Sequence, residues 1–470
     1  MPIRDFYLVF GLMTFLLACS LFACKSDKQL KQVDVAISNA IIICVDSLGT
    51  IISNGTLLIN EGLIVKLGPD SILKDTYQAH ENIDAQGNFV LPGLINTHTH
   101  LPMSLLRGIA DDLPLSDWLE KYIWPTEAAF MDREAIKIGS QLAMAELIRT
   151  GTTCFNDAYF FADEIAGVAE KAGLRGRVGE GLLDYPTPSY PKAAAAMEAT
   201  RTLANTYRDH PCIGVSVAPH SPYACSAELL VEASALAQEL EIPLHIHISE
   251  TQTEQGIIAA RYAQSPTAYL DSLGFWRAGF VGAHGVWLDS LDQLVLAQKG
   301  VSIAHCPESN MKLASGVAPV PEMQERGLNV GLGTDGASSN NDLDMFEEMS
   351  TAAKLAKVHR LDPTVLAAET VLRMATIEGA KLMGWENKIG SIELNKAADL
   401  IIVSNKALHM QPLYDVYSQI VYCADGSDVT HSMVAGKWLM KDQQLLTLDQ
   451  RQILKDVSTL RMRILAALPE

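Results

Sequence analysis

The stretch Pro92-Gly93-Leu94-Ile95-Asn96-Thr97-His98-Thr99-His100 decides both the fold and the chemistry of this chain. Its apolar start predicts a buried strand, and two histidines stand two residues apart at the end of that strand. Because residues i and i+2 of a strand share one face, both imidazoles can bind the same metal ion. The stretch therefore predicts a strand that ends in a metal site.

Apolar runs alternate with helical stretches over residues 91–386, the pattern of a parallel sheet covered by helices. Eight such runs favour a closed (β/α)8 barrel over an open sheet. The predicted strands are Phe89–Asn96, Thr152–Asn156, Arg175–Leu183, Gly214–Ala218, Pro243–Ile248, Phe280–Ala283, Val301–Ala304 and Asn329–Gly333.

Polar side chains stand at the carboxyl ends of these strands, which converge on one mouth of a barrel, where active sites form. Six of the twelve histidines fall there, more than core packing would place. A lone histidine at a strand end is more often structural, and we interpret His305 in that way. The residues at the strand ends are His98, His100, Asn156, Asp157, Glu180, Asp184, His220, His247, Glu250, His284, His305 and Asp335.

Two β-rich segments, 33–90 and 387–445, flank the barrel segment. Each contains short apolar runs separated by Gly, Asn and Asp turns, which predict strands. We therefore expect an α/β fold: a (β/α)8 TIM-like barrel, 91–386, with a small β-sandwich domain assembled from both termini. A C-terminal helix is expected within 446–470.

The first 24 residues differ from everything after them. Arg4 precedes an apolar run over 6–23, and polar residues follow abruptly, as in a secretory signal. Leu21-Phe22-Ala23-Cys24 resembles the lipobox of bacterial lipoproteins, which predicts an acylated Cys24 and a tether over 25–32. Cys19 fits almost as well, and an uncleaved transmembrane anchor is the alternative because the run just reaches spanning length. We expect a lipid-anchored protein of a bacterial cell envelope, on the periplasmic or extracellular side.

A net charge of −19 over 470 residues, without a basic cluster in the body of the chain, argues against nucleic acid as a partner. Beyond Cys24 no C-x-x-C pair occurs, so we expect mostly buried free thiols, with a disulfide left open. A homo-oligomer is also left open. The cysteines are Cys44, Cys154, Cys212, Cys225, Cys306 and Cys423.

From about Val33 to Trp438 the chain resembles the amidohydrolase superfamily, in particular its branch of S-adenosylhomocysteine / 5′-methylthioadenosine deaminases and triazine chlorohydrolases. Besides the H-x-H pair, the resemblance is carried by Leu106-Arg107-Gly108, Asp111-Asp112-Leu113-Pro114-Leu115, Trp118, Ala218-Pro219-His220-Ser221-Pro222-Tyr223, His247-Ile248-Ser249-Glu250-Thr251, Ala283-His284, Pro307-Glu308-Ser309-Asn310-Met311-Lys312-Leu313, Gly333-Thr334-Asp335-Gly336-Ala337, Ile389-Gly390-Ser391-Ile392-Glu393 and Ala397-Ala398-Asp399-Leu400.

This resemblance implies a single divalent metal ion with an open position for water. Zinc is the expected ion and iron(II) the alternative, because imidazole and carboxylate ligands suit both. The lysine that bridges two ions in other members is missing from 175–184 and 214–220, and the H-x-E and P-C-x-x-C pair of cytidine-type deaminases does not occur. The implied ligands are His98, His100, His247 and Asp335.

The resemblance also implies catalytic and substrate-binding roles. Glu250 would carry a proton from the water to a substrate ring nitrogen, while Asp335 and His284 would orient the hydroxide. His284 is also placed to stabilise the developing charge. Besides Glu250, the residues expected to contact the substrate are Trp118 and Glu127 near a sugar, His220 and Glu180. A surface position for Glu127 is the alternative.

The expected reaction is hydrolytic deamination of an aminopurine nucleoside such as adenosine or 5′-methylthioadenosine. Hydroxide attacks the amine-bearing ring carbon and ammonia leaves. The alternatives are a chlorohydrolase or aminohydrolase of another N-heterocycle such as a triazine, and, more remotely, a lipid-anchored binding protein that has lost catalysis.

Glu180 stands where relatives that use S-adenosylhomocysteine place an arginine for the carboxylate of the substrate. Two carboxylates repel, so Glu180 predicts a preference for neutral or cationic substrates. A salt bridge of Glu180 with Arg175 or Arg177 is the alternative.

Overall fold

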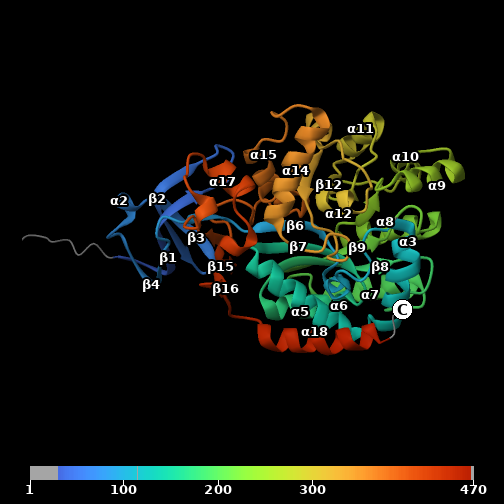
Figure 1. The fold of residues 1–470 in the computed structure, drawn as a ribbon, viewed down its shortest axis with the longest axis horizontal. Helices are drawn as coiled ribbons and strands as arrows, with labels where there is room; N and C mark the ends of the chain where they lie inside the picture. Colours follow the sequence, from blue (N-terminus) through green and yellow to red (C-terminus); the bar gives the residue numbers. More distant parts are fainter. Residues whose placement is uncertain (1–29, 114, 467–470) are drawn as a thin grey trace, which may run out of the picture.

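Eight parallel strands form a barrel in the computed structural model, which describes residues 30–113 and 115–466 (Figure 1). The strands pair in two runs of four, in the orders β6-β7-β8-β9 and β10-β11-β12-β13. Val217 bridges to Leu244 where the runs meet, and the Asp335 N–H donates to the His98 carbonyl on the other side. The predicted (β/α)8 barrel is therefore confirmed. Its strands are β6 (Leu94–Thr99), β7 (Thr152–Tyr159), β8 (Arg175–Leu182), β9 (Ile213–Pro219), β10 (His245–Ile248), β11 (Val281–His284), β12 (Ser302–His305) and β13 (Asn329–Leu332).

The first predicted strand, Phe89–Asn96, is in fact two strands that belong to different sheets. β5 (Phe89–Pro92) pairs with strands of the sheet outside the barrel, whereas β6 is the first strand of the barrel. The break falls at Gly93, where an added Cβ would lie 2.0 Å from the Thr153 hydroxyl oxygen. Only glycine lets the chain pass β7 this closely.

Helices cover the outside of the barrel (Figure 1). Several begin at a side chain that caps the first turn; Asp132, for example, accepts from the Ala135 N–H and starts α5. The helices are α3 (Leu115–Trp118), α4 (Trp124–Phe130), α5 (Arg133–Arg149), α6 (Ala162–Ala172), α7 (Ala193–Thr206), α8 (Ala227–Leu240), α9 (Gln252–Tyr262), α10 (Pro266–Ser272), α11 (Ser290–Lys299), α12 (Pro307–Lys312), α13 (Val320–Glu325), α14 (Met345–Arg360), α15 (Ala368–Met374) and α16 (Ile377–Leu382).

A second sheet of nine strands lies beside the barrel and is built from both ends of the chain, as predicted (Figure 1). Eight of its strands follow one hydrogen-bonded path, β17-β16-β15-β14-β5-β1-β2-β3, and β4 branches from β1, whereas the predicted sandwich would have two separate sheets. The reason is the long β1, which pairs with β2 along one edge and with β4 and then β5 along the other. Besides β5, the strands are β1 (Lys31–Ile43), β2 (Ile51–Asn60), β3 (Leu63–Pro69), β4 (Tyr77–Asp84), β14 (Leu400–Val403), β15 (Val429–Val434), β16 (Lys437–Lys441) and β17 (Gln444–Leu445).

The short helix α2 (Asp70–Leu73) packs against β2 and β3 of this sheet, and α17 (Val416–Tyr422) packs against α14 and α15. The last helix, α18 (Gln450–Leu465), packs against α5 of the barrel (Figure 1). Within residues 30–113 and 115–466, no helix combines the length and apolar character needed to cross a membrane. The predicted signal, Cys24 and the first part of the tether lie outside the described residues. The six cysteines from Cys44 onward are free thiols, four of them buried.

Candidate active site

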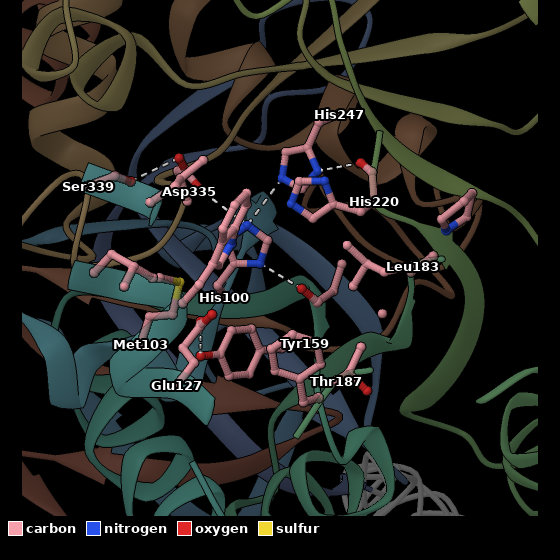
Figure 2. Close-up of a pocket in the computed structure, with 18 of the residues that line it drawn as sticks. His100, Met103, Glu127, Tyr159, Leu183, Thr187, His220, His247, Asp335 and Ser339 are labelled. Carbon is pink, nitrogen blue, oxygen red and sulfur yellow. Dashed lines mark hydrogen bonds and ion pairs between the residues drawn. The ribbon is translucent and has the colours of Figure 1, made fainter. Parts of the chain in front are cut away.

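Four side chains meet at the carboxyl mouth of the barrel, and Figure 2 shows three of them, His100, His247 and Asp335. His98, on β6, and His100, directly after β6, each place Nε2 3.3 Å from the Asp335 Oδ1 atom. His247, from β10, places its own Nε2 3.2 Å from that of His100. The structure thus brings together the four metal ligands that the resemblance implied.

The chemistry of this donor set fits a divalent metal ion. Two of the imidazoles already use Nδ1 in a hydrogen bond. His100 Nδ1 lies 2.6 Å from the Ala158 carbonyl oxygen, and His247 Nδ1 lies 2.7 Å from the His220 carbonyl oxygen. The inner Nε2 of His98 is buried without a hydrogen-bond partner among the described residues. Burial lowers the pKa of His98 to about 3 and also lowers that of His247, so their lone pairs are available. Neutral imidazoles and a carboxylate are typical ligands of zinc.

Asp335 is fixed so that one oxygen faces the histidines. Its Oδ2 accepts from the hydroxyls of Ser309, at 2.7 Å, and Ser339, at 2.9 Å. The carboxylate is buried, but the neighbouring imidazoles of His98, His100 and His284 hold its pKa well below its ordinary range. Asp335 is therefore ionised, as a metal ligand requires. Its backbone, with φ of +60°, lies in the left-handed region, which the surrounding structure must sustain.

Glu250 and His284 face each other beside the four ligands, with His284 Nε2 3.9 Å from Glu250 Oε2. Burial raises the pKa of Glu250. Burial acts in the opposite direction on His284, but the carboxylates of Glu250 and Asp335 outweigh it and raise the pKa of that imidazole. The pair is therefore placed to exchange protons with a substrate bound beside it.

Two functional residues were missed from the sequence. Glu254 is buried, and its carboxylate accepts from the N–H groups of Ser249, at 2.9 Å, and Glu250, at 2.8 Å, which fixes the backbone that carries Glu250. The pattern Thr251-x-x-Glu254 is a capping-box signature that could have identified it. His245 lies against His98, and a second H-x-H, His245-Ile246-His247, was the available signal.

The site opens into a cavity of about 150 Å³. Trp118, Glu127 and His220 line it, as the resemblance implied, and Figure 2 shows Glu127 with Tyr159 on one side of His100. The Tyr159 hydroxyl donates to the Glu127 carboxylate, and burial raises the pKa of Glu127 to about 7. Glu127 is buried, so the alternative of a surface position is wrong. No lysine or arginine lines this cavity in the described parts of the chain.

Glu180 does not line the cavity, contrary to the sequence prediction. Its neighbour Gly181 lines it, and consecutive strand residues point to opposite faces, so Glu180 is turned toward α6. There its carboxylate accepts from the Ala162 N–H at 2.9 Å and from the Ser189 hydroxyl. The alternative salt bridge is not formed either, since the partner of Arg175 is Asp399.

The other polar residues at the strand ends have structural contacts. Asn156 donates to the Thr97 carbonyl oxygen at 3.0 Å, and Asp157 accepts from the Leu101 N–H at 2.6 Å. His305 is buried and lies outside the groups of side chains that could hold a metal in the described chain. These residues support the loops around the site and do not enter it.

Comparison with known proteins agrees with this geometry. The chain is 43% identical over 426 residues to a 5-methylthioadenosine/S-adenosylhomocysteine deaminase of Syntrophobacter fumaroxidans, covering 91% of this chain and 97% of the relative. It is 43% identical over 425 residues to a 5′-deoxyadenosine deaminase of Methanosarcina mazei, covering 90% and 96%. A solved adenosine deaminase of Xanthomonas campestris with bound zinc superposes with a TM-score of 0.92 at 38% identity, covering 93% of this chain and all of that one.

The model of the amidohydrolase family matches residues 89–439, a range that contains all four ligands, Glu250 and His284. This match and the relatives agree with the motifs read from the sequence. The chain therefore belongs to the amidohydrolase family.

Proposed function

We propose that this protein is a hydrolase that deaminates adenine nucleosides. The observation that carries the proposal is that Glu250 and His284 line the same cavity as three of the four candidate metal ligands, His100, His247 and Asp335. Relatives named as deaminases of 5′-methylthioadenosine and 5′-deoxyadenosine share more than 40% of their residues with this chain, which supports the reaction class. The intact site argues against a binding protein that has lost catalysis.

One divalent ion, zinc, would be held by His98, His100, His247 and Asp335. When bound, such an ion lowers the pKa of water toward neutrality and so supplies a nucleophile at working pH. Iron(II) suits the same donors, and metal analysis of the purified protein separates the two.

The protein side chains move the protons of the reaction. Glu250 accepts a proton from the attacking water and delivers it to the ring nitrogen beside the amine-bearing carbon. The water oxygen forms a bond to that carbon, the carbon–amine bond breaks, and the amine leaves as ammonia with a further proton from the water. His284 donates a hydrogen bond to the oxygen as negative charge develops there. One water is consumed and one ammonia is released.

The sugar of the nucleoside would lie against Glu127 and Trp118. The buried Glu127 carboxyl, held by Tyr159, can bond to ribose hydroxyls, and the indole supplies an apolar surface. Ser221 occupies Nδ1 of His220 at 3.0 Å, which leaves the other ring nitrogen for the substrate. Burial lowers the pKa of His220 to about 4, so this imidazole is neutral.

The cavity favours nucleosides with an uncharged 5′ substituent. Its lining also contains Pro186 and the rings of Trp124 and Tyr185, whose centres lie 6.0 Å apart, and these match an apolar group such as a methylthio or deoxy carbon. An amino acid carboxylate, as in S-adenosylhomocysteine, would find no cation on this wall, and a charge left unpaired in a partly dehydrated cleft is costly. We therefore still propose a preference for substrates without such a carboxylate, and its basis is the cavity lining instead of Glu180.

Ammonia release from a panel of substrates tests the proposal. The panel contains adenosine, 5′-methylthioadenosine, 5′-deoxyadenosine, S-adenosylhomocysteine, guanine and a chlorotriazine, with kcat/KM determined for each. We expect the uncharged adenine nucleosides to be the best substrates. Chloride release from the triazine without ammonia release from any nucleoside would favour the chlorohydrolase alternative instead. A higher kcat/KM for S-adenosylhomocysteine than for 5′-methylthioadenosine would contradict the substrate preference alone.

For location, we propose a lipid anchor at Cys24 that holds the enzyme at the bacterial cell envelope. The support is the sequence pattern of an apolar run that ends in Leu21-Phe22-Ala23-Cys24 before polar residues.

A further inference from the structure

A second hollow, of about 400 Å³, lies at the opposite end of the barrel from the active site. Its lining includes Pro243, two residues before β10, Phe280, directly before β11, and the end of α16. These are the amino ends of the strands, whereas the metal-binding residues occupy the carboxyl ends. None of the catalytic or substrate-binding side chains lines this hollow.

Arg177, on β8, is a buried cation without a counterion at this hollow. Its side chain lines the hollow but is only 8% exposed, and its Nε has no hydrogen-bond partner among the described residues. Burial lowers the pKa of Arg177 to about 10, so the guanidinium is still charged at neutral pH. A buried charge is ordinarily paired, as the neighbouring Arg175 is with Asp399.

The surroundings of Arg177 hold its guanidinium in place without neutralising it. The group lies 4.9 Å from the ring centre of Trp385, a cation–π distance. On the strand beside it, Gly214 leaves room, since a Cβ there would lie 3.4 Å from Arg177 Nε and 3.1 Å from the indole. The guanidinium is therefore positioned before any ligand arrives.

Two more cations stand at the rim of the hollow. Arg277 and Lys381 are exposed and form no ion pair within the described chain, and Glu241 is the one carboxylate in the lining. The three cations thus outnumber the carboxylates. The rest of the wall is largely apolar and includes Ala237, Ile242, Pro243, Phe280, Leu382 and Met383.

We propose that this hollow binds a small organic phosphate, with Arg177 as the buried anchor and Arg277 and Lys381 at the rim. A guanidinium presents N–H donors in a planar fork that matches phosphate oxygens, and the pairing would supply the missing counterion. The apolar wall would receive the organic part of the ligand. The site is separate from the proposed deaminase chemistry and does not depend on it.

Calorimetric titration of the metal-loaded protein with phenyl phosphate and with inorganic phosphate, at constant ionic strength, tests the inference. The rim variant Arg277→Gln/Lys381→Gln changes only exposed side chains, so its folding is not at risk. Lys354→Gln, an exposed lysine of α14 outside the hollow, is the matched control, and Arg177→Met removes the anchor.

We expect saturable binding of phenyl phosphate to the wild type and to Lys354→Gln, at least tenfold weaker binding to the rim variant, and none to Arg177→Met. Ammonia release by the rim variant should equal that of the wild type, which separates this site from the deaminase site. No saturable binding to the wild type, or equal affinity in the rim variant, would overturn the proposal. Equal affinity for inorganic and phenyl phosphate would overturn the role of the apolar wall. Should Arg177→Met fail to fold, the rim variant alone decides.

Discussion

His245 Nε2 lies 2.9 Å from His98 Nδ1 inside the barrel, and both rings are buried. For His98 to offer the lone pair of Nε2 to a metal ion, its Nδ1 must carry the proton, which His245 then accepts. His245 is therefore a positioning residue that sets the tautomer and the direction of a ligand. Such outer partners of ligating histidines affect metal affinity strongly.

Replacement of His245 should weaken metal binding. We expect His245→Phe, which keeps a ring but offers no acceptor, to lower metal affinity by roughly 10–100-fold. His245→Gln offers an amide oxygen to His98 and should retain more of the affinity. Competition with a chromophoric chelator measures both, and His359→Gln on the exposed face of α14 is the control. Unchanged affinity in His245→Phe would show that His98 needs no such partner.

The purified protein should hold about one divalent ion per chain, because the site combines three imidazoles with one carboxylate, and residues 175–184 and 214–220 contain no lysine to bridge a second ion. His247→Ala and Asp335→Ala should each lose the ion, as elemental analysis after gel filtration will show. Two tightly bound ions per chain in the wild type would contradict the single-ion site.

Glu250→Gln should retain the ion and lose most of its turnover, because the amide keeps the shape of the side chain but accepts no proton. Loss of a general acid/base group typically lowers the rate by roughly 10²–10⁴-fold. Steady-state ammonia release with metal content measured in parallel tests this, and the exposed Glu228→Gln on α8 is the control. A nearly wild-type kcat would assign the proton transfer to another group.

Glu180→Gln should change how stability depends on pH. Burial raises the pKa of Glu180 from 4.5 to about 7, so between these pH values the folded state holds a proton that the unfolded state has lost. The contribution of Glu180 to the free energy of unfolding therefore falls as pH rises from about 4.5 to about 7, by on the order of 3 kcal/mol at most. The glutamine variant should avoid that loss, because an amide does not ionise in this pH range. Its amide can still accept from the Ala162 N–H and donate to Ser189.

Urea unfolding of the wild type and Glu180→Gln at pH 4.5, 6 and 8 measures the difference between the two proteins. We expect the variant to gain relative to the wild type as pH rises. A difference that is constant with pH would show that Glu180 keeps an ordinary pKa. Glu180→Arg should leave the preference between 5′-methylthioadenosine and S-adenosylhomocysteine unchanged, since the side chain lies away from the cavity.

Cys24→Ala should abolish labelling of the full-length protein by a fatty-acid probe in a bacterial host, because it removes the acylated thiol. The matched variant Cys19→Ala should be labelled as the wild type is. The reverse result would move the lipid to Cys19, and no labelling of the wild type would leave the uncleaved anchor as the better explanation.

The barrel could be predicted because each step followed from local patterns. Apolar runs alternate with helical stretches, and His98 and His100 share a face at any register of their strand. The orientation of Glu180 could not be predicted in this way. β8 is buried on both faces, so its sequence shows no alternation of polar and apolar residues that would mark the inner side.

The same limit explains the other errors. Phe89–Asn96 is predicted as one strand although Pro92-Gly93, a turn signal, stands at the change of sheet. The close contact with Thr153, which explains why glycine is needed there, shows only in the packed structure. The surroundings of Arg177 could not be predicted either, since its neighbours Trp385 and Gly214 come from distant parts of the chain. Contacts of this kind depend on how helices and strands pack, which a single sequence does not state.

The pairing of β5 with β14 has a consequence for biosynthesis. Residues 89–92 leave the ribosome more than 300 residues before their partner strand at Leu400–Val403. Until then the nascent chain carries an apolar strand with an unpaired backbone edge, a template for pairing with other chains. A chain truncated just before Leu400 would contain every metal ligand and still expose that edge. We expect it to aggregate instead of accumulating as a smaller active enzyme.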